Sequence, residues 1–167
     1  MTDIEVRIRP VDLPHGPRDT MAALRRGGHH ALLESALVMP GQAEWSCVAG
    51  PARATLYTDA RGTCLERDGE VVQRWDDPFD ALAVMARRDV PLRIDGERPD
   101  GLGFMAGWAG VLGYDLVRHL ERLPALAAND PALPAMWWMA VDQVLAFHHP
   151  SGRWWQCTAR GPRDAWP

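Results

Sequence analysis

The sequence contains no lysine, so all 18 of its basic residues are arginines. Its acidic residues number 22, the formal net charge is −4, and the two signs of charge are interspersed without any basic run. Proteins that bind nucleic acid usually gather positive charge on one face or along one helix. The charge pattern therefore argues against nucleic-acid binding, and we expect no nucleic-acid partner.

Cysteine is scarce, and long hydrophobic runs are missing. The three cysteines, Cys47, Cys64 and Cys157, are odd in number and far apart, which argues against a disulfide framework or a zinc ribbon and fits a reducing compartment. The longest uncharged run, residues 101–114, is too short and too rich in glycine to span a bilayer. The first ten residues lack the apolar centre of a signal peptide. We expect a cytoplasmic protein that does not associate with a membrane.

Most of the 167 residues fall into short segments of alternating or continuous apolar character, which is typical of β-strands. Asp68-Gly69 lies between two such segments and predicts a tight hairpin. Asp77-Pro78 predicts the start of a helix, because aspartate caps helices and proline suits their first position. We expect one α+β domain of two packed, mainly antiparallel β-sheets with a few flanking helices. Strands are expected over residues 4–9, 29–38, 45–49, 53–59, 63–67, 70–75, 135–149 (bent at Asp142) and 153–159, with a helix over 19–26 and a linker over 91–99.

A glycine-rich stretch, residues 101–114, is predicted to form a buried strand that turns at Gly113 into an amphipathic helix. Asp115 would lie at the start of this helix, with Leu116, Val117, Leu120 and Leu123 on its apolar face. Glycine in a strand usually marks the close approach of another backbone, a bulge or a ligand. The glycine spacing does not match a dinucleotide-binding or P-loop motif. We therefore expect tight packing against a neighbouring segment at this strand.

A carboxylate and a hydroxyl, Glu34 and Ser35, interrupt the apolar segment 29–38. Two explanations remain open: an arginine or backbone partner elsewhere in the fold, or a ligand that carries an ammonium or hydroxyl group. No catalytic set is visible. The tandem pairs His29-His30 and His148-His149 would point to opposite faces of a strand, so neither pair predicts a metal site.

The order of several motifs resembles one protein family. The motifs are Leu32-Leu33-Glu34-Ser35, Trp45-Ser46-Cys47-Val48-Ala49, Gly110 to Arg118 (GVLGYDLVR), Glu121-Arg122-Leu123-Pro124, Leu133-Pro134-Ala135-Met136 and Val141-Asp142. This series, covering about residues 28–156, is similar to the N-terminal domain of the chorismate-utilising synthases. These enzymes are component I of anthranilate synthase and of aminodeoxychorismate synthase.

The resemblance implies a domain that is not catalytic alone. Residues 1–160 would form the N-terminal domain, and residues 161–167 would begin a linker to a C-terminal domain that binds chorismate and Mg²⁺. No cofactor is then expected within this domain. The full enzyme would add ammonia, delivered by a glutamine amidotransferase subunit, to chorismate. A free-standing module that senses an aromatic amino acid, or a protein that mainly docks the amidotransferase, are alternatives.

The resemblance also implies an L-tryptophan pocket, lined here by Glu34, Ser35, Ala43, Glu44 and Trp45. The family often has arginine where this chain has Glu44, and tyrosine or phenylalanine where it has Trp45. A second carboxylate beside Glu34 would favour an ammonium group and repel a carboxylate. The short segments around Glu34-Ser35 favour aminodeoxychorismate synthase, in folate biosynthesis, over anthranilate synthase, in tryptophan biosynthesis.

Overall fold

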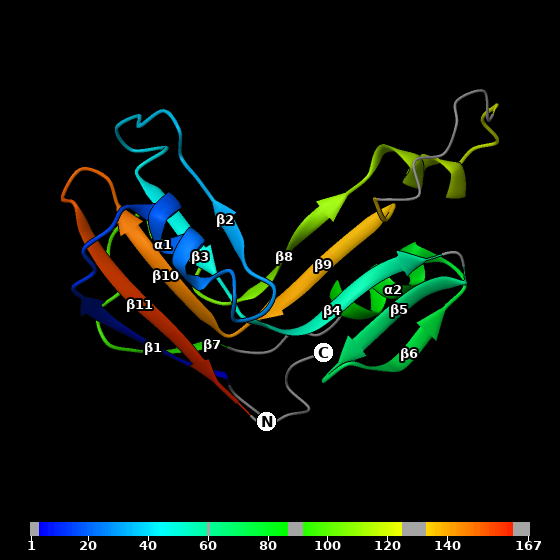
Figure 1. Cartoon of the computed structure of the whole chain (residues 1–167), viewed down its shortest axis with the longest axis horizontal. Helices are drawn as coiled ribbons and strands as arrows, with labels where there is room; N and C mark the ends of the chain where they lie inside the picture. Colours follow the sequence, from blue (N-terminus) through cyan, green and yellow to red (C-terminus); the bar gives the residue numbers. More distant parts are fainter. Residues whose placement is uncertain (1–3, 60, 87–91, 125–132, 162–167) are drawn as a thin grey trace. The chain divides into compact units, whose positions relative to one another are not determined.

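The computed structural model describes residues 4–59, 61–86, 92–124 and 133–161. Its elements, in chain order, are β1 (Ile4–Val11), α1 (Pro17–Leu24), β2 (Ala31–Leu33), β3 (Trp45–Ala49), β4 (Ala52–Asp59), β5 (Gly62–Arg67), β6 (Glu70–Trp75), α2 (Pro78–Ala86), β7 (Leu92–Asp95), β8 (Gly107–Leu112), the 3₁₀ helix η1 (Tyr114–His119), β9 (Met136–Val141), β10 (Gln143–His148) and β11 (Arg153–Arg160). They form two compact units with one sheet each (Figure 1).

The first unit contains a six-stranded sheet in the order β2-β3-β10-β11-β1-β7. Its pairs are antiparallel except β1 with β7, which is parallel. The first residues of β1 alternate strictly between buried and exposed, as the sequence predicts for a half-buried strand. Pro10 lies in the part of β1 that pairs only with β11, where its missing N–H costs no bond to β7.

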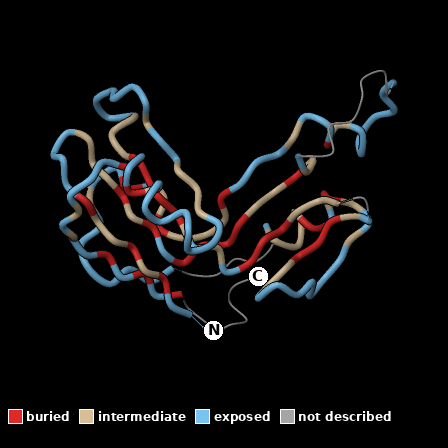
Figure 2. The backbone as a smooth tube through the Cα atoms, in the orientation of Figure 1, coloured by how far each residue is buried: buried red, intermediate tan, exposed pale blue. Residues whose placement is uncertain are grey.

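One face of this sheet forms the core of the unit, shown in red in Figure 2. Leu102 and Met105, in the irregular segment between β7 and β8, are also buried. All three cysteines are free and buried. Burial raises the pKa of the Cys47 thiol to about 11 and that of Cys157 to about 12, so both remain protonated at neutral pH. The buried apolar residues of the strands include Ile4, Val6, Ile8, Cys47, Ala49, Val144, Ala146, Cys157 and Ala159.

The second unit contains a five-stranded sheet in the order β6-β5-β4-β9-β8. The strands expected over 53–59, 63–67 and 70–75 are confirmed as β4, β5 and β6, which pair antiparallel in chain order. The predicted Asp68-Gly69 hairpin is confirmed too, with positive φ at both residues (51° and 80°). The predicted start of α2 is also confirmed, since the Asp77 carboxylate accepts a hydrogen bond from the Phe79 backbone N–H at 2.8 Å. Leu56, Cys64, Leu65, Met136 and Met139 make up most of this unit's buried apolar residues.

Close packing at the predicted glycines is confirmed. A Cβ atom on Gly110 would collide with the backbone of Trp137 and Trp138, and one on Gly113 would lie 2.8 Å from the Ala135 carbonyl oxygen. The same carbonyl accepts a hydrogen bond from the Gly113 N–H at 2.7 Å. These glycines therefore allow β8 and its continuation to lie directly against β9. The predicted bend at Asp142 is confirmed as well, because it separates β9 from β10.

Several sequence-based expectations were wrong. The strand expected over 29–38 is only β2, and Leu33, Leu37 and Val38 are exposed. The linker expected over 91–99 contains β7. Only Leu116 of η1 is buried, and the Asp115 carboxylate binds Arg118 instead of capping the helix. The helix expected over 19–26 is α1, which starts two residues earlier and buries Pro17 and Thr20.

No helix among the residues that the structure describes is long and apolar enough to cross a bilayer. The linker predicted to begin at residue 161 falls mostly outside the described ranges.

Candidate functional site

The five residues predicted to line a ligand pocket lie at the two ends of one loop, which joins β2 to β3. Glu34 and Ser35 directly follow β2, Ala43 and Glu44 precede β3, and Trp45 is its first residue. β2 and β3 are antiparallel neighbours, with Leu33 opposite Cys47. The pairing therefore brings the two ends of the β2–β3 loop together (Figure 1), and a hydrogen bond joins Ser35 to Trp45.

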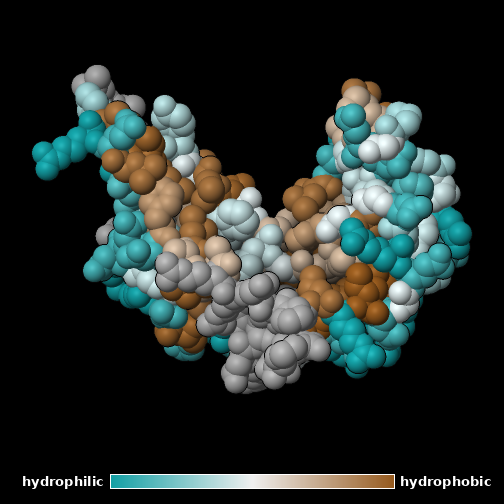
Figure 3. Space-filling model, turned by 180° about the vertical axis from the view of Figure 1, so that it is seen from behind, coloured by the Kyte–Doolittle hydropathy of each residue, from teal (hydrophilic) through white to brown (hydrophobic). Residues whose placement is uncertain are grey.

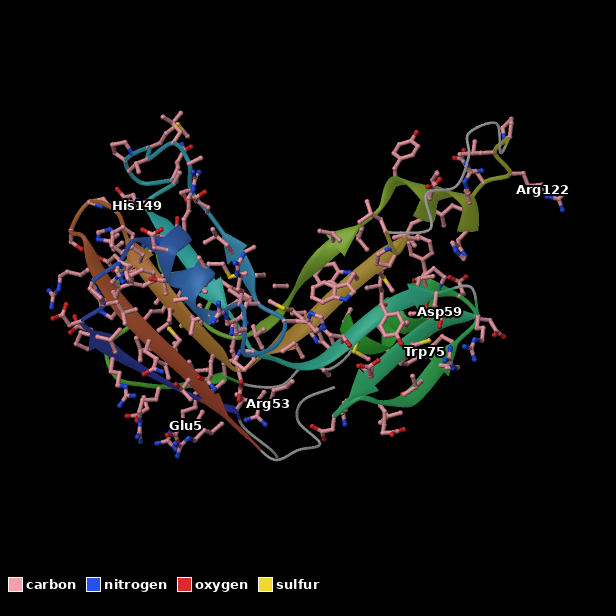
Figure 4. All side chains as sticks on the ribbon, in the orientation of Figure 1. Glu5, Arg53, Asp59, Trp75, Arg122 and His149 are labelled. Carbon is pink, nitrogen blue, oxygen red and sulfur yellow. The ribbon has the colours of Figure 1, made fainter. Side chains whose placement is uncertain are left out.

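Ser35 is held at the centre of a hydrogen-bond chain. Its hydroxyl donates to the Trp45 carbonyl oxygen at 2.7 Å, and its backbone N–H donates to the Ser46 hydroxyl at 3.0 Å. Ser46 Oγ lies 2.7 Å from Nε2 of His149, which Figure 4 labels. A hydroxyl has one hydrogen to donate and two lone pairs. With that hydrogen engaged, Ser35 Oγ is left as an acceptor, which suits a ligand ammonium.

Glu34 is exposed, not buried in an apolar strand as the sequence suggested. Arg18 of α1 donates from Nε to both of its carboxylate oxygens, at 2.8 and 3.0 Å. This hydrogen bond is the main reason that the pKa of the Glu34 carboxyl lies below its ordinary value, with the charge of Arg18 adding to it. Of the two explanations that the sequence left open, an internal arginine partner is the one found.

Glu44 organises its own loop. Its Oε1 accepts a hydrogen bond from the Gly41 N–H at 3.0 Å, and its backbone carbonyl accepts one from the His149 N–H at 2.8 Å. Its Oε2 lies 3.8 Å from Nε2 of His148. The Glu44 carboxylate, the second one expected in the pocket, thus lies beside the start of β3. Ala43, half-buried, donates its N–H to the Met39 carbonyl at 3.0 Å and completes the turn before Glu44.

Trp45 belongs to an aromatic cluster at the same end of the sheet. Its ring centroid lies 4.6 Å from that of His148, with the rings tilted by 33°, and 5.2 Å from that of Trp155, edge to face. Its indole N–H donates to the Asp100 carbonyl oxygen at 3.2 Å. The Arg153 guanidinium lies 5.5 Å from the centre of the Trp155 ring. Edge-to-face ring contacts and cation–π contacts of this kind fix side-chain orientation.

Sequence reasoning missed Ser46, Asp100, His148 and His149 as neighbours of this loop. The tandem histidines were considered only as metal ligands, and they do point to different neighbours: His148 contacts Trp45, whereas His149 contacts Ser46. Predicting these neighbours requires the register of β10 against β3, which places His148 opposite Trp45. A strand pairing between residues about a hundred positions apart leaves no local signal in one sequence.

A hydroxyl–imidazole pair lies beside this loop. Ser46 and His149 form a hydroxyl–imidazole pair, but Ser46 is completely buried and cannot reach a substrate. Among the described residues, no group of three or more His, Cys, Asp or Glu side chains could hold a metal ion. We therefore assign no reaction step and no metal to these residues. What the loop offers is a set of acceptors beside aromatic rings.

Comparison with known proteins shows what the chain is similar to. No protein-family model matches it. Anthranilate synthase component 1 of Mycolicibacterium smegmatis is 35% identical over 122 residues, or 72% of this chain. Aminodeoxychorismate synthase component 1 of Klebsiella aerogenes is 32% identical over 118 residues, or 71% of this chain.

The chain spans 22% and 26% of the length of these two relatives. Among solved structures, anthranilate synthase component I from Streptococcus pneumoniae aligns with 86% of this chain and 31% of its own, at 19% identity and a TM-score of 0.47. By sequence, this chain is a relative of component 1 of anthranilate synthase and of aminodeoxychorismate synthase, and it matches about a quarter of their length.

Proposed function

We propose that this chain is the N-terminal, non-catalytic domain of a chorismate-aminating synthase component 1. The observation that carries the proposal is the identity of more than 30% over about 72% of the chain to component 1 of two synthases. In this proposal Mg²⁺ and chorismate bind to the rest of the synthase, and a glutamine amidotransferase supplies ammonia.

The proposal favours aminodeoxychorismate synthase, and hence folate biosynthesis in the cytoplasm. The segments around Glu34-Ser35 are short, as in that enzyme. The alternative is anthranilate synthase, which is favoured by the slightly higher identity, 35% against 32%. The two differ in their product, so chemical identification of the product separates them.

In the same proposal the β2–β3 loop binds L-tryptophan. Ser35 Oγ, and the carboxylates of Glu34 and Glu44, would accept hydrogen bonds from the ligand ammonium. The aromatic cluster around Trp45 offers ring faces and edges to an indole. The Arg18–Glu34 pair leaves part of the charge of Glu34 already neutralised, so Ser35 is the acceptor on which binding depends most.

Reconstitution tests the proposed function. The part of the Mycolicibacterium smegmatis component 1 that this chain does not match would be expressed separately and mixed with the purified chain, chorismate, Mg²⁺ and ammonium. A second mixture would use the corresponding part of the Klebsiella aerogenes protein. We expect an aminated product only when this chain is present. The mass and spectrum of that product identify which of the two synthases the chain belongs to. If both mixtures give the same product yield with and without the chain, the proposal is wrong.

A further inference from the structure

The last residues of β8 are apolar and exposed on both faces of the sheet. Val111 is 61% exposed and Leu112 is 54% exposed, and Gly110 before them is exposed too. Successive strand residues point to opposite faces, so the described residues cover neither face of the sheet at this end. β8 is also an edge strand, with β9 as its neighbour in the five-stranded sheet. In native proteins, an uncharged edge strand that is exposed in this way is normally protected by another segment.

The exposure continues into the 3₁₀ helix. Tyr114, its first residue, is 88% exposed, and Leu120, which follows it, is 69% exposed. We call Val111, Leu112, Tyr114 and Leu120 the β8–η1 surface. Figure 2 shows the end of β8 and η1 as exposed, and Figure 3 shows hydrophobic surface over the part of this unit that contains β8 and β9. Apolar residues gathered in this way mark an interaction site more often than singly scattered ones.

The geometry restricts what can cover this surface. A second copy that paired edge to edge with β8 would fill the free hydrogen-bonding edge, yet it would leave Val111 and Leu112 exposed on the two faces. A single extended peptide that pairs with the edge of β8 would also leave both side chains exposed. Covering both faces requires two segments of one folded partner. Charge adds no preference, because Arg118 is paired with Asp115 at 2.9 Å and Arg122 is adjacent to Glu121.

We propose that the β8–η1 surface is where the rest of the synthase docks, with apolar segments on both faces of the end of β8. The inference rests on the proposed function. The length of the relatives identifies the partner that would bind to the β8–η1 surface. They are about four times as long as the part of them that this chain matches, so most of a synthase component 1 lies beyond the residues described. The partner is thus a folded protein domain with an apolar contact surface, bound without a large electrostatic contribution.

The two edge strands of the same sheet provide a matched pair of substitutions. Val111→Asp places a charge on the β8–η1 surface, and Val72→Asp places one on β6, at the opposite edge, where valine is 52% exposed. Leu120→Asp tests the helical part of the surface independently of the strand. All three side chains are exposed, so we expect the variants to fold, as circular dichroism and melting curves will verify.

The experiment measures binding of each fluorescently labelled chain to the unmatched part of the Mycolicibacterium smegmatis component 1. We expect Val111→Asp and Leu120→Asp to weaken binding at least tenfold and Val72→Asp to leave it unchanged. Equal binding by all variants would overturn the docking site and leave the proposed function intact. Failure of the unsubstituted chain both to bind and to restore amination would overturn both proposals. A concentration-dependent dimer abolished by Val111→Asp would instead assign the surface to a second copy, against the proposal.

Discussion

At the scale of single residues, the loop between β2 and β3 is defined by hydrogen bonds that join distant parts of the chain. Ser35 bonds to Trp45 and Ser46, and Ser46 bonds to His149. The sequence predicted the residues at the two ends of the loop through a family resemblance. It could not predict the histidine, because the register of β10 against β3 is set by the folded sheet.

Ser35 gives the first prediction. Replacing it with alanine removes the hydroxyl oxygen proposed to accept the ligand ammonium, so L-tryptophan should bind about tenfold or more weakly, in line with the loss of a hydrogen bond to a charged group. Isothermal titration calorimetry on the chain measures this change. Thr158→Val, which removes a half-buried hydroxyl elsewhere in the same sheet, should bind like the unsubstituted chain. Absence of heat from the unsubstituted chain at millimolar L-tryptophan would refute the pocket.

The pair Arg18–Glu34 gives the second prediction. Since Arg18 is the main cause of the lowered pKa of Glu34, Arg18→Gln should raise that pKa toward its ordinary value. A lowered carboxyl pKa stabilises the fold above the unfolded-state pKa, and this contribution is lost as pH falls through the folded-state value. Carboxyl-carbon NMR titration measures the shift. Arg7→Gln, which breaks the separate pair with Asp95, should leave the Glu34 titration unchanged; an equal shift in both variants would contradict the assignment.

At the scale of elements, local signals predicted more than non-local ones. The Asp68-Gly69 hairpin, the start of α2 at Pro78 and the bend at Asp142 all depend on a few neighbouring residues, and all were predicted. β7 was missed because it is an exposed strand, and its place in the sheet comes only from parallel pairing with β1. β2 was predicted too long because its apolar continuation was assumed to be buried.

Gly113 gives the prediction at this scale. Its backbone φ is ordinary at −73°, but a side chain there would meet the Ala135 carbonyl, so Gly113→Val must push β8 and β9 apart. Overpacking costs about 1–3 kcal/mol, and each kcal/mol lowers the melting temperature of a domain this size by roughly 2–4 °C. Differential scanning calorimetry measures the change. Gly103→Val, where a Cβ meets nothing within 4 Å, is the control and should melt close to the unsubstituted chain. Equal melting temperatures would show that β8 has room to move.

At the scale of the whole molecule, the proposed function predicts a domain that works as part of a longer synthase. The β8–η1 surface has apolar side chains that the described residues leave exposed. The relatives match this chain over only about a quarter of their own length. Fold class was predictable from strand and turn patterns, but the uncovered surface was not. Val111, Leu112 and Tyr114 were expected in a buried strand, and Leu120 was expected on the apolar face of a helix, but all four are exposed.

The mass of the polypeptide that contains this sequence in its source cells tests the central claim most directly. Mass spectrometry of that polypeptide, captured with an antibody against this chain, gives the answer together with any stably bound protein. We predict a total several times the 18.6 kDa of this chain, carried by one long polypeptide or by an assembly. A lone 18.6 kDa chain without a bound protein would contradict the account and would favour a free-standing binding module.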